Sequence, residues 1–260
     1  MKQFYKLEEF CKENNLKYNE TKVEQFDKFC DLLIERNKVM NLTAVTDPEE
    51  IDVKHFVDSV EAAPVILEYC EKLAGKKKQE PEIQNKCDHS IISVIDMGTG
   101  AGFPGLPLAI MLPDLKFTLA DALNKRINFL NEVINEGNIK NVTAIQGRAE
   151  EIGQSSMRET FDFCVSRAVA NLSVLLEYCL PVVKVGGYAI LYKSGDYKEE
   201  LDAARTALEV LGGEIEEIRE FKLPDSDISR SLIIIYKGKT TQIKYPRRPG
   251  KPSKSPITNK

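Results

Sequence analysis

The residues best suited to chemistry lie in the run VIDMGTGAGFPG at 94–105. An apolar strand leads into glycines at alternate positions and then into a proline that can begin a helix. Glycines have no Cβ atom, so the chain can turn sharply and a ligand can lie close to the backbone. Phe103 takes the place of the third glycine of the dinucleotide pattern, which weighs against a bound pyrophosphate. We expect a flat or extended ligand here, with a simple tight turn as the alternative.

An acidic residue follows at the distance that a nucleoside site requires. Asp121 comes directly after the apolar run 116–120 and lies 19 residues beyond Gly102. In α/β nucleoside sites, a carboxylate at this place binds the ribose hydroxyls. The loop and the acid together predict a bound nucleoside, although the acid alone would also suit a helix cap or an exposed surface. The pair does not distinguish an NAD enzyme from one that uses S-adenosylmethionine.

Further polar groups follow later strands. Gly147–Glu151 comes after the third predicted strand, Ser166-Arg167-Ala168 after the fourth, and Lys193 at the end of the fifth. Ligands of open α/β sheets bind at the carboxyl ends of the strands, so these residues are candidates for the same site. The structural alternatives are a charged loop, a helix-start residue and a solvated lysine.

The pattern around these residues is that of an α/β protein, because short apolar runs alternate with amphipathic segments. We predict helices near 104–112, 124–136, 170–183 and 197–211, with Asn124 capping the second. Strands are predicted near 91–96, 116–120, 142–146, 161–165, 186–193, 214–221 and 231–236.

The predicted organisation has four parts. Residues 1–74 form a helical segment packed on the sheet, in which Thr21 and Glu24 suggest a capping box, Asp47 caps the next helix and Pro64 can interrupt it. Residues 75–90 contain few apolar side chains and read as a polar linker. A catalytic domain spans 91–236, and a basic, proline-rich tail spans 237–260.

Composition restricts the class of protein. A chain of 260 residues can bury a substantial core, and no apolar run is long enough for a membrane-spanning helix. The charged N-terminus does not resemble a secretory signal, so we expect a soluble, cytoplasmic protein. Six cysteines without a C-x-x-C pair argue against a zinc site or a disulfide framework, and we expect no metal.

The charge is distributed unevenly. The net charge is −4, from 36 basic and 40 acidic residues. Residues 237–260 hold eight basic residues and no acidic one, which leaves 28 against 40, or −12, on the rest. Because the tail is also rich in proline, we expect an extended cationic arm, with a disordered solubilising tail as the alternative.

Seven motifs then occur in a consistent order: NLTAV, KHFVDSV, VIDMGTGAGFPG, ADALNKRINFL, GRAEE, SRAVANL and RRPGKPSKSPI. With them the chain closely resembles, over nearly its whole length, the bacterial 16S ribosomal RNA guanine N7 methyltransferases, formerly called glucose-inhibited division protein B. The segment 75–90 is longer than the usual family pattern. The resemblance implies a Rossmann-like class I S-adenosylmethionine-dependent methyltransferase fold, with a seven-stranded, mostly parallel sheet and an N-terminal helical extension.

The resemblance also implies the roles of individual residues. Asp121 would bind the ribose of S-adenosylmethionine, Asp96 would receive its ammonium group, and Ala149 and Glu150 would flank the adenine. Arg167 would face the methionine end or the guanine. The cleft mouth would include Asn41, Thr43, His55 and Asp58, although His55 can equally be a satisfied, partly buried histidine. The expected cofactor-binding set is Asp96, Gly98, Thr99, Gly100, Gly102, Phe103, Asp121, Ala149, Glu150 and Arg167.

Methylation of guanine N7 sets modest chemical demands. N7 carries a free lone pair and no proton, so in-line attack on the methyl group needs positioning but no general base. The sequence has no Pro-Cys dipeptide and no Asn/Asp-Pro-Pro-aromatic segment after the fourth strand, where Ser166 and Arg167 stand instead. We expect both to position the reactants, with Arg167 bound to guanine O6 or to phosphate.

An acidic body repels RNA, so basic residues must supply the attraction to 16S ribosomal RNA in the small subunit or its precursor. The expected RNA-binding residues are Asn41, Thr43, His55, Lys125, Arg126, Lys193, Arg247, Arg248, Lys251 and Lys254. We expect a monomer. Two other functions compete: a non-catalytic RNA-binding or cofactor-sensing module of the same fold, and an NAD-dependent oxidoreductase. The Tyr-x-x-x-Lys pair common in the latter occurs only at Tyr18 and Lys22, outside the nucleotide domain.

Overall fold

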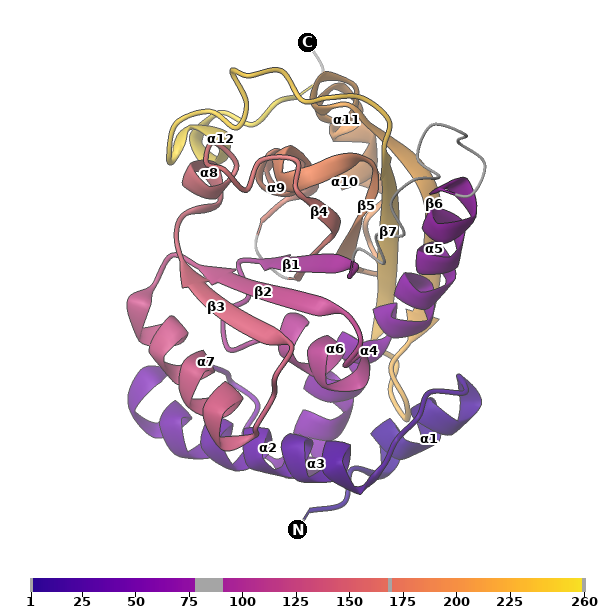
Figure 1. Cartoon of the computed structure of the whole chain (residues 1–260), viewed down its shortest axis with the longest axis vertical. Coiled ribbons are helices and arrows are strands. Elements are labelled where there is room, and N and C mark those ends of the chain that lie inside the picture. Colours follow the sequence, from indigo (N-terminus) through magenta and orange to yellow (C-terminus); the bar gives the residue numbers. More distant parts are fainter. Residues whose placement is uncertain (1, 78–90, 168–169, 259–260) are drawn as a thin grey trace.

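One seven-stranded sheet organises the protein (Figure 1). The computed structural model describes residues 2–77, 91–167 and 170–258. The strand order is β3-β2-β1-β4-β5-β7-β6, and β7 runs antiparallel to the other six strands. The strands are β1 (Ser93–Met97), β2 (Lys116–Asp121), β3 (Val142–Gln146), β4 (Phe161–Arg167), β5 (Val183–Ser194), β6 (Gly213–Lys222) and β7 (Ser229–Lys237). The predicted α/β class and mostly parallel sheet are confirmed.

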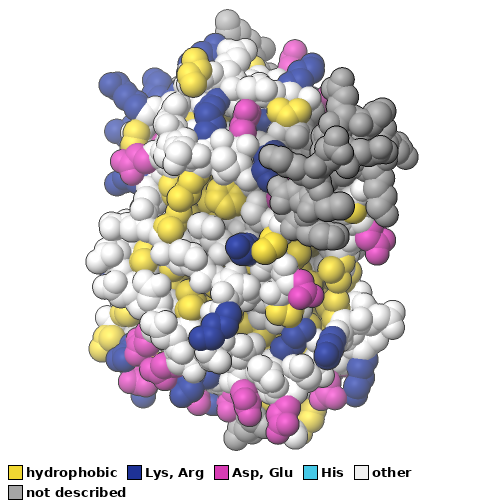
Figure 2. All heavy atoms as spheres, in the orientation of Figure 1, with side chains coloured by type: hydrophobic (Ala, Val, Ile, Leu, Met, Phe, Trp, Pro, Cys, Tyr) yellow, Lys and Arg dark blue, Asp and Glu magenta, His cyan; other side chains and the backbone are white. Residues whose placement is uncertain are grey.

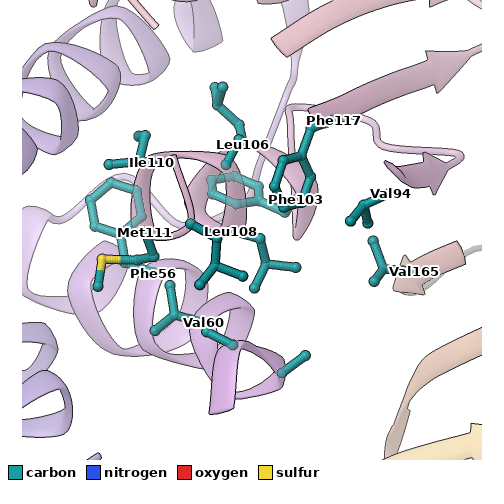
Figure 3. Close-up of a cluster of buried hydrophobic side chains, with 14 of the residues drawn as sticks. Phe56, Val60, Val94, Phe103, Leu106, Leu108, Ile110, Met111, Phe117 and Val165 are labelled. Atoms are coloured by element: carbon teal, nitrogen blue, oxygen red, sulfur yellow. The ribbon is translucent and has the colours of Figure 1, made fainter. Parts of the chain in front are cut away.

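Each face of the sheet has its own apolar core, because successive side chains of a strand point to opposite faces. Val94 joins the core formed with α6 (Gly105–Met111), α7 (Asn124–Glu136) and the N-terminal helices. Ile95 and Met97 join the core beneath α9 (Leu172–Cys179), α10 (Lys198–Ala203) and α11 (Arg205–Leu211). Figure 3 shows part of the first core, in which Phe103 and Leu106 lie near Phe117.

The N-terminal segment is helical and packs on the α6 side of the sheet. It comprises α1 (Tyr5–Glu13), α2 (Glu20–Met40), α3 (Pro48–Ile51), a π-helical turn (Asp52–Val57), α4 (Asp58–Val60) and α5 (Ala62–Lys77). Buried Asp52 accepts hydrogen bonds from the amides of Lys6 and Leu7 at 2.9 and 3.1 Å, which fixes the start of α1 on the π-helical turn. The ring of Phe56, in the same turn, contacts Phe26 at 4.8 Å between centroids. These contacts hold the turn that carries His55.

Several predicted helix boundaries are wrong. Asn19 caps α2 in place of Thr21, since its side chain accepts from the Lys22 amide and the helix has already begun at Glu20. Asn124 lies inside α7 and does not cap it. Asp47 caps α3 as predicted, with its carboxylate accepting from two backbone amides.

The later helices also differ in length from the prediction. The break before α5 falls at Glu61 rather than at Pro64, and α5 continues to Lys77, so the predicted linker does not begin at residue 75. The rest of that linker, 78–90, lies outside the described residues. The helix predicted to end at 183 ends at Cys179, because Pro181 has no backbone N–H and a 3-10 turn leads directly into β5.

The C-terminal segment is folded onto the protein, which corrects the expectation of an extended arm. Residues 239–258 cross α8 (Ala149–Ile152) and α9 and contain a short helix, α12 (Lys251–Lys254). The guanidinium of Arg247 binds the carboxylate of Glu177, which is fully buried, and the Gly250 amide donates to Glu150 at 2.8 Å. Prolines do not prevent packing here because side-chain partners satisfy the backbone groups.

Within the described residues, no helix combines the length and the apolar character needed to cross a membrane.

Candidate functional site

The glycine-rich loop turns immediately after β1. The amides of Gly98 and Thr99 both donate to the Ala120 carbonyl, at 2.9 and 3.0 Å, which ties the loop to the end of β2. Gly98, Gly100 and Gly102 have φ values of +76°, +62° and +100°, a backbone region that side chains with a Cβ rarely adopt. The predicted turn therefore requires these glycines.

The loop glycines nevertheless differ in their surroundings. A Cβ on Gly100 would meet no atom within 4 Å, whereas one on Gly102 would lie 3.0 Å from Leu130. The surroundings of Gly105, at the start of α6, are more crowded still, since a Cβ there would lie 2.4 Å from Leu119 and 2.6 Å from Asp96. Gly102 and Gly105 thus allow the loop and helix to pack, and Gly100 leaves space for a ligand.

Asp121 closes the other side of the loop. Its side chain is 4% exposed. One carboxylate oxygen accepts from the Gly100 amide and from Arg126, each at 3.0 Å, and the other accepts from the Leu123 amide at 2.9 Å. Arg126, predicted to contact RNA, is therefore an ion-pair partner of Asp121 at this site.

Asp96 is fully buried beneath the loop. Its Oδ2 accepts from the Gly105 amide at 2.8 Å, while neither its Oδ1 nor the Thr99 hydroxyl makes a hydrogen bond of normal geometry to a described residue. Burial raises the pKa of Asp96 to about 7, although the Thr99 hydroxyl, the Gly105 amide and the Arg167 charge act in the opposite direction. Two buried polar atoms are thus available to a polar ligand group.

The glycine loop and Asp121 border a cleft of about 490 Å³, which we call the loop cleft; the predicted cofactor-binding residues Asp96 and Gly102 are not among its lining residues. One wall is a stack in which the rings of His55 and Phe103 lie 4.5 Å apart and the Arg167 guanidinium lies 5.1 Å from the Phe103 ring. Nε2 of His55 lies 2.7 Å from the Thr43 hydroxyl. Burial, helped by the Arg167 charge, lowers the pKa of His55 to about 4, so its ring is neutral near pH 7. The lining residues are Leu42, Thr43, His55, Gly98, Thr99, Gly100, Ala101, Phe103, Asp121, Ala122, Leu123, Arg126 and Arg167.

A second cleft of about 440 Å³, the basic cleft, shares His55 and Arg167 with the first. Its other lining residues are Lys54, Asp58, Tyr192, Lys193, Ser194 and Arg230. Nη1 of Arg167 binds Asp58 at 2.6 Å, and Asp58 is only 3% exposed. Two clefts that meet at a shared wall suit a reaction between two different molecules.

Several predicted residues lie elsewhere. The Ser166 hydroxyl is buried and donates to the Met97 carbonyl, which joins β4 to β1, so it supports the loop from below. Ala149 and Glu150 are not among the described residues that line the loop cleft. Asn41 is exposed and ends α2 in a left-handed conformation.

Among the predicted basic RNA-binding residues, Lys125, Arg248, Lys251 and Lys254 are exposed, whereas Arg247 is bound to Glu177 and Lys193 to Glu200.

Lys54, Tyr192 and Arg230 were missed as site residues. Arg230 follows a turn and looks like an ordinary strand-start charge in the sequence. It reaches the basic cleft because β7 runs antiparallel to β5, which pairs Arg230 with Ser194 at the end where Lys193 also lies. Tyr18 and Lys22, the residue pair of the NAD alternative, line neither cleft, and Nζ of Lys22 donates to the carbonyls of Lys17 and Met111.

This strand order, with a glycine loop after β1 and an acidic residue after β2, defines a Rossmann-like class I S-adenosylmethionine-dependent methyltransferase fold. The family model described as rRNA small subunit methyltransferase G matches residues 22–74 and 81–233. The chain belongs to this family.

Two relatives, both named Ribosomal RNA small subunit methyltransferase G, agree with that assignment. The chain is 46% identical to Ribosomal RNA small subunit methyltransferase G of Alkaliphilus metalliredigens, with 96% of this chain and 97% of the relative covered. It is 51% identical to the protein of the same name from Lachnoclostridium phytofermentans, with 93% and 92% covered. Among solved structures, M. jannaschii TYW2 in complex with AdoMet has 16% identity and a TM-score of 0.45, over 58% of this chain and 71% of that chain.

Proposed function

We propose that the protein transfers a methyl group from S-adenosylmethionine to N7 of one guanine in a loop of 16S ribosomal RNA. The observation that carries this proposal is the pair of clefts that meet at His55 and Arg167. The loop cleft would hold the cofactor and the basic cleft the acceptor nucleotide. The names of the relatives support ribosomal RNA of the small subunit as the substrate.

The residues of the loop cleft fit this cofactor. Bound S-adenosylmethionine would supply an electrophilic methyl group on a positively charged sulfur. Asp96 Oδ1 and the Thr99 hydroxyl could accept hydrogen bonds from its ammonium group, which would satisfy two buried polar atoms. The carboxylate of Asp121 is suited to the ribose hydroxyls, and the free space at Gly100 lets a ligand approach the backbone.

The shared wall fits an acceptor that needs no base. His55 is neutral near pH 7, and the positive charge of Arg167 is compensated by Asp58. A full positive charge beside N7 would oppose transfer, because positive charge develops on the purine as the methyl group arrives. The role left to this chain is to hold the guanine and the methyl donor in line. Such positioning can lower the activation free energy by about 7 to 11 kcal/mol.

RNA binding would rely on the exposed part of the C-terminal segment. Figure 2 shows basic side chains gathered over α12 and its neighbours. The exposed cations there include Arg248, Lys251 and Lys254. Phosphate neutralisation dominates RNA affinity, so this surface would offset the repulsion from the acidic remainder of the protein.

Mapping of N7-methylguanine in 16S ribosomal RNA from cells with and without the protein tests the proposal. We expect one guanine to lose its modification, and purified protein to restore it on small subunits with tritiated S-adenosylmethionine. Arg167→Gln should lower transfer by about 100-fold, since misplaced reactants lose that much. Arg219→Gln is the matched control, because that arginine also pairs with carboxylates but lies outside both clefts. Unchanged methylation in cells lacking the protein would refute the assignment.

A further inference from the structure

The basic cleft has an excess of positive charge where it borders the loop cleft. Its lining includes four basic residues, Lys54, Arg167, Lys193 and Arg230, and one acidic residue, Asp58. Lys54 and Lys193 pair with Glu50 and Glu200, whose side chains are 50% and 33% exposed. Such partly exposed pairs are weak, so an anion can compete for these lysines.

Asp58 organises the arginines of this cleft. Its Oδ2 binds Arg167 at 2.6 Å, and its Oδ1 lies 3.5 Å from Nε of Arg230. One buried carboxylate therefore faces two guanidinium groups from β4 and β7, through a hydrogen bond to Arg167 and a longer ion pair to Arg230 that is not a hydrogen bond. Each guanidinium has five N–H donors, and Asp58 contacts only a few of them, so the others can bind a ligand.

The position of Arg230 follows from the sheet. Arg230 is opposite Ser194 in the β5–β7 register, and Lys193 precedes Ser194. Arg167 ends the neighbouring strand β4, where it pairs with Tyr192. Strands in the central sheet thus hold three of the four cations, and such a rigid support lowers the entropy lost on ligand binding.

We propose that Arg230, which forms an ion pair with Asp58, binds the phosphodiester of the acceptor nucleotide in the basic cleft. The planar guanidinium matches two phosphate oxygens, which a lysine ammonium cannot do. Arg167 remains beside the stacked wall, and Lys54 adds positive charge to the cleft lining. This inference rests on the proposed function, because it takes the basic cleft as the site of the RNA nucleotide.

Calorimetry with saturating S-adenosylhomocysteine, which blocks the loop cleft, tests the phosphate contact directly. We expect guanosine 5′-monophosphate to bind the full-length protein about tenfold more tightly than guanosine, as one charge-assisted contact allows. Arg230→Gln should abolish this difference and Arg230→Lys should restore part of it. Arg219→Gln should preserve it, since Arg219 is 31% exposed against 30% for Arg230 and lies outside the cleft. Equal binding of nucleotide and nucleoside to the unmodified protein would overturn the proposal.

Methyl transfer to small ribosomal subunits supplies the second measurement. Arg230→Gln should raise KM for the subunits about tenfold, leave kcat and the affinity for S-adenosylmethionine within about twofold, and reduce the salt dependence of binding by about one phosphate contact. A loss confined to kcat would contradict a phosphate-binding role. If the unmodified protein methylates no subunit RNA but still prefers the nucleotide through Arg230, the proposed function fails and the phosphate site stands.

Discussion

At the scale of single residues, the buried carboxyl of Asp96 makes the stability of the folded protein depend on pH. Its pKa lies at about 7, against an ordinary value of 3.8, because burial disfavours the charged form. In the unfolded chain the group has already lost its proton near pH 4. The stabilising contribution of Asp96 is therefore complete below about pH 4 and is lost as the pH rises through about 7.

The ionised form of Asp96 is the one that attracts an ammonium group. We predict that the affinity for S-adenosylmethionine increases between pH 6 and pH 8, because ionisation of Asp96 then accompanies binding. Isothermal titration across this range measures the effect. Asp96→Asn is the control, with weaker binding and a flat pH profile. If both proteins show the same pH dependence, Asp96 is not the group responsible.

Sequence reasoning recognised the residues with local signals and missed those that act at long range. The glycine loop and Asp121 are recognisable because a sharp turn and a ribose-binding acid each require a residue type at a fixed place. The pairing of Arg167 with Asp58 joins residues 109 positions apart, and no pattern on either element indicates it. Arg230 reaches the cleft only through the antiparallel register of β7.

At the scale of elements, the loop and the start of α6 respond differently to an added methyl group. We predict that Gly105→Ala loses stability by about 1 to 3 kcal/mol, because the new Cβ would overlap Leu119 and Asp96. Gly100→Ala meets no neighbouring atom, so it should lose only about 1 to 2 kcal/mol from its left-handed conformation.

Urea denaturation and cofactor titration separate these two effects. Gly100→Ala should weaken cofactor binding more strongly than its stability loss suggests, since the methyl group would enter the space offered to the ligand. Equal behaviour of the two variants in both measurements would show that Gly100 does not face the ligand.

The ion pair that docks the C-terminal segment should contribute to stability. Arg247→Ala would leave the buried carboxylate of Glu177 without its guanidinium partner, so we expect a loss of about 3 kcal/mol of stability. Thermal or urea unfolding measures the change. Arg248→Ala, at the exposed neighbouring position, is the control and should change stability by less than about 0.5 kcal/mol. Similar losses in both variants would argue against the buried pair.

The elements of the sheet could be predicted because apolar runs and amphipathic helices have distinct periods, and all seven strands lie where they were expected. Helix ends were harder to predict from the sequence. Asn19 and Thr21 are both suitable caps, and only the backbone path decides between them. Docking of the final segment was not predictable. Its proline and basic content indicate a local preference for an extended chain, whereas its docking depends on Glu177, a buried residue far away in the sequence.

At the scale of the whole molecule, exposed basic residues should control RNA affinity separately from cofactor affinity. We predict that the triple variant Arg248→Gln, Lys251→Gln and Lys254→Gln weakens binding to small subunits and lowers its salt dependence, because up to three phosphate contacts are lost. Filter binding at several salt concentrations gives both values. S-adenosylmethionine affinity and unfolding should stay as in the unmodified protein. Unchanged salt dependence would exclude this surface.

The pairing of Glu177 with Arg247 also bears on how the chain is made. The two residues lie 70 positions apart, so a growing polypeptide contains α9 well before its partner has been synthesised. Until then, the carboxylate cannot enter the interior without a cost of several kcal/mol, and the face beneath α9 stays incompletely closed. Residues 239–258 follow α9 in the sequence, so the core beneath α9 is completed only after this later segment has been synthesised and has docked.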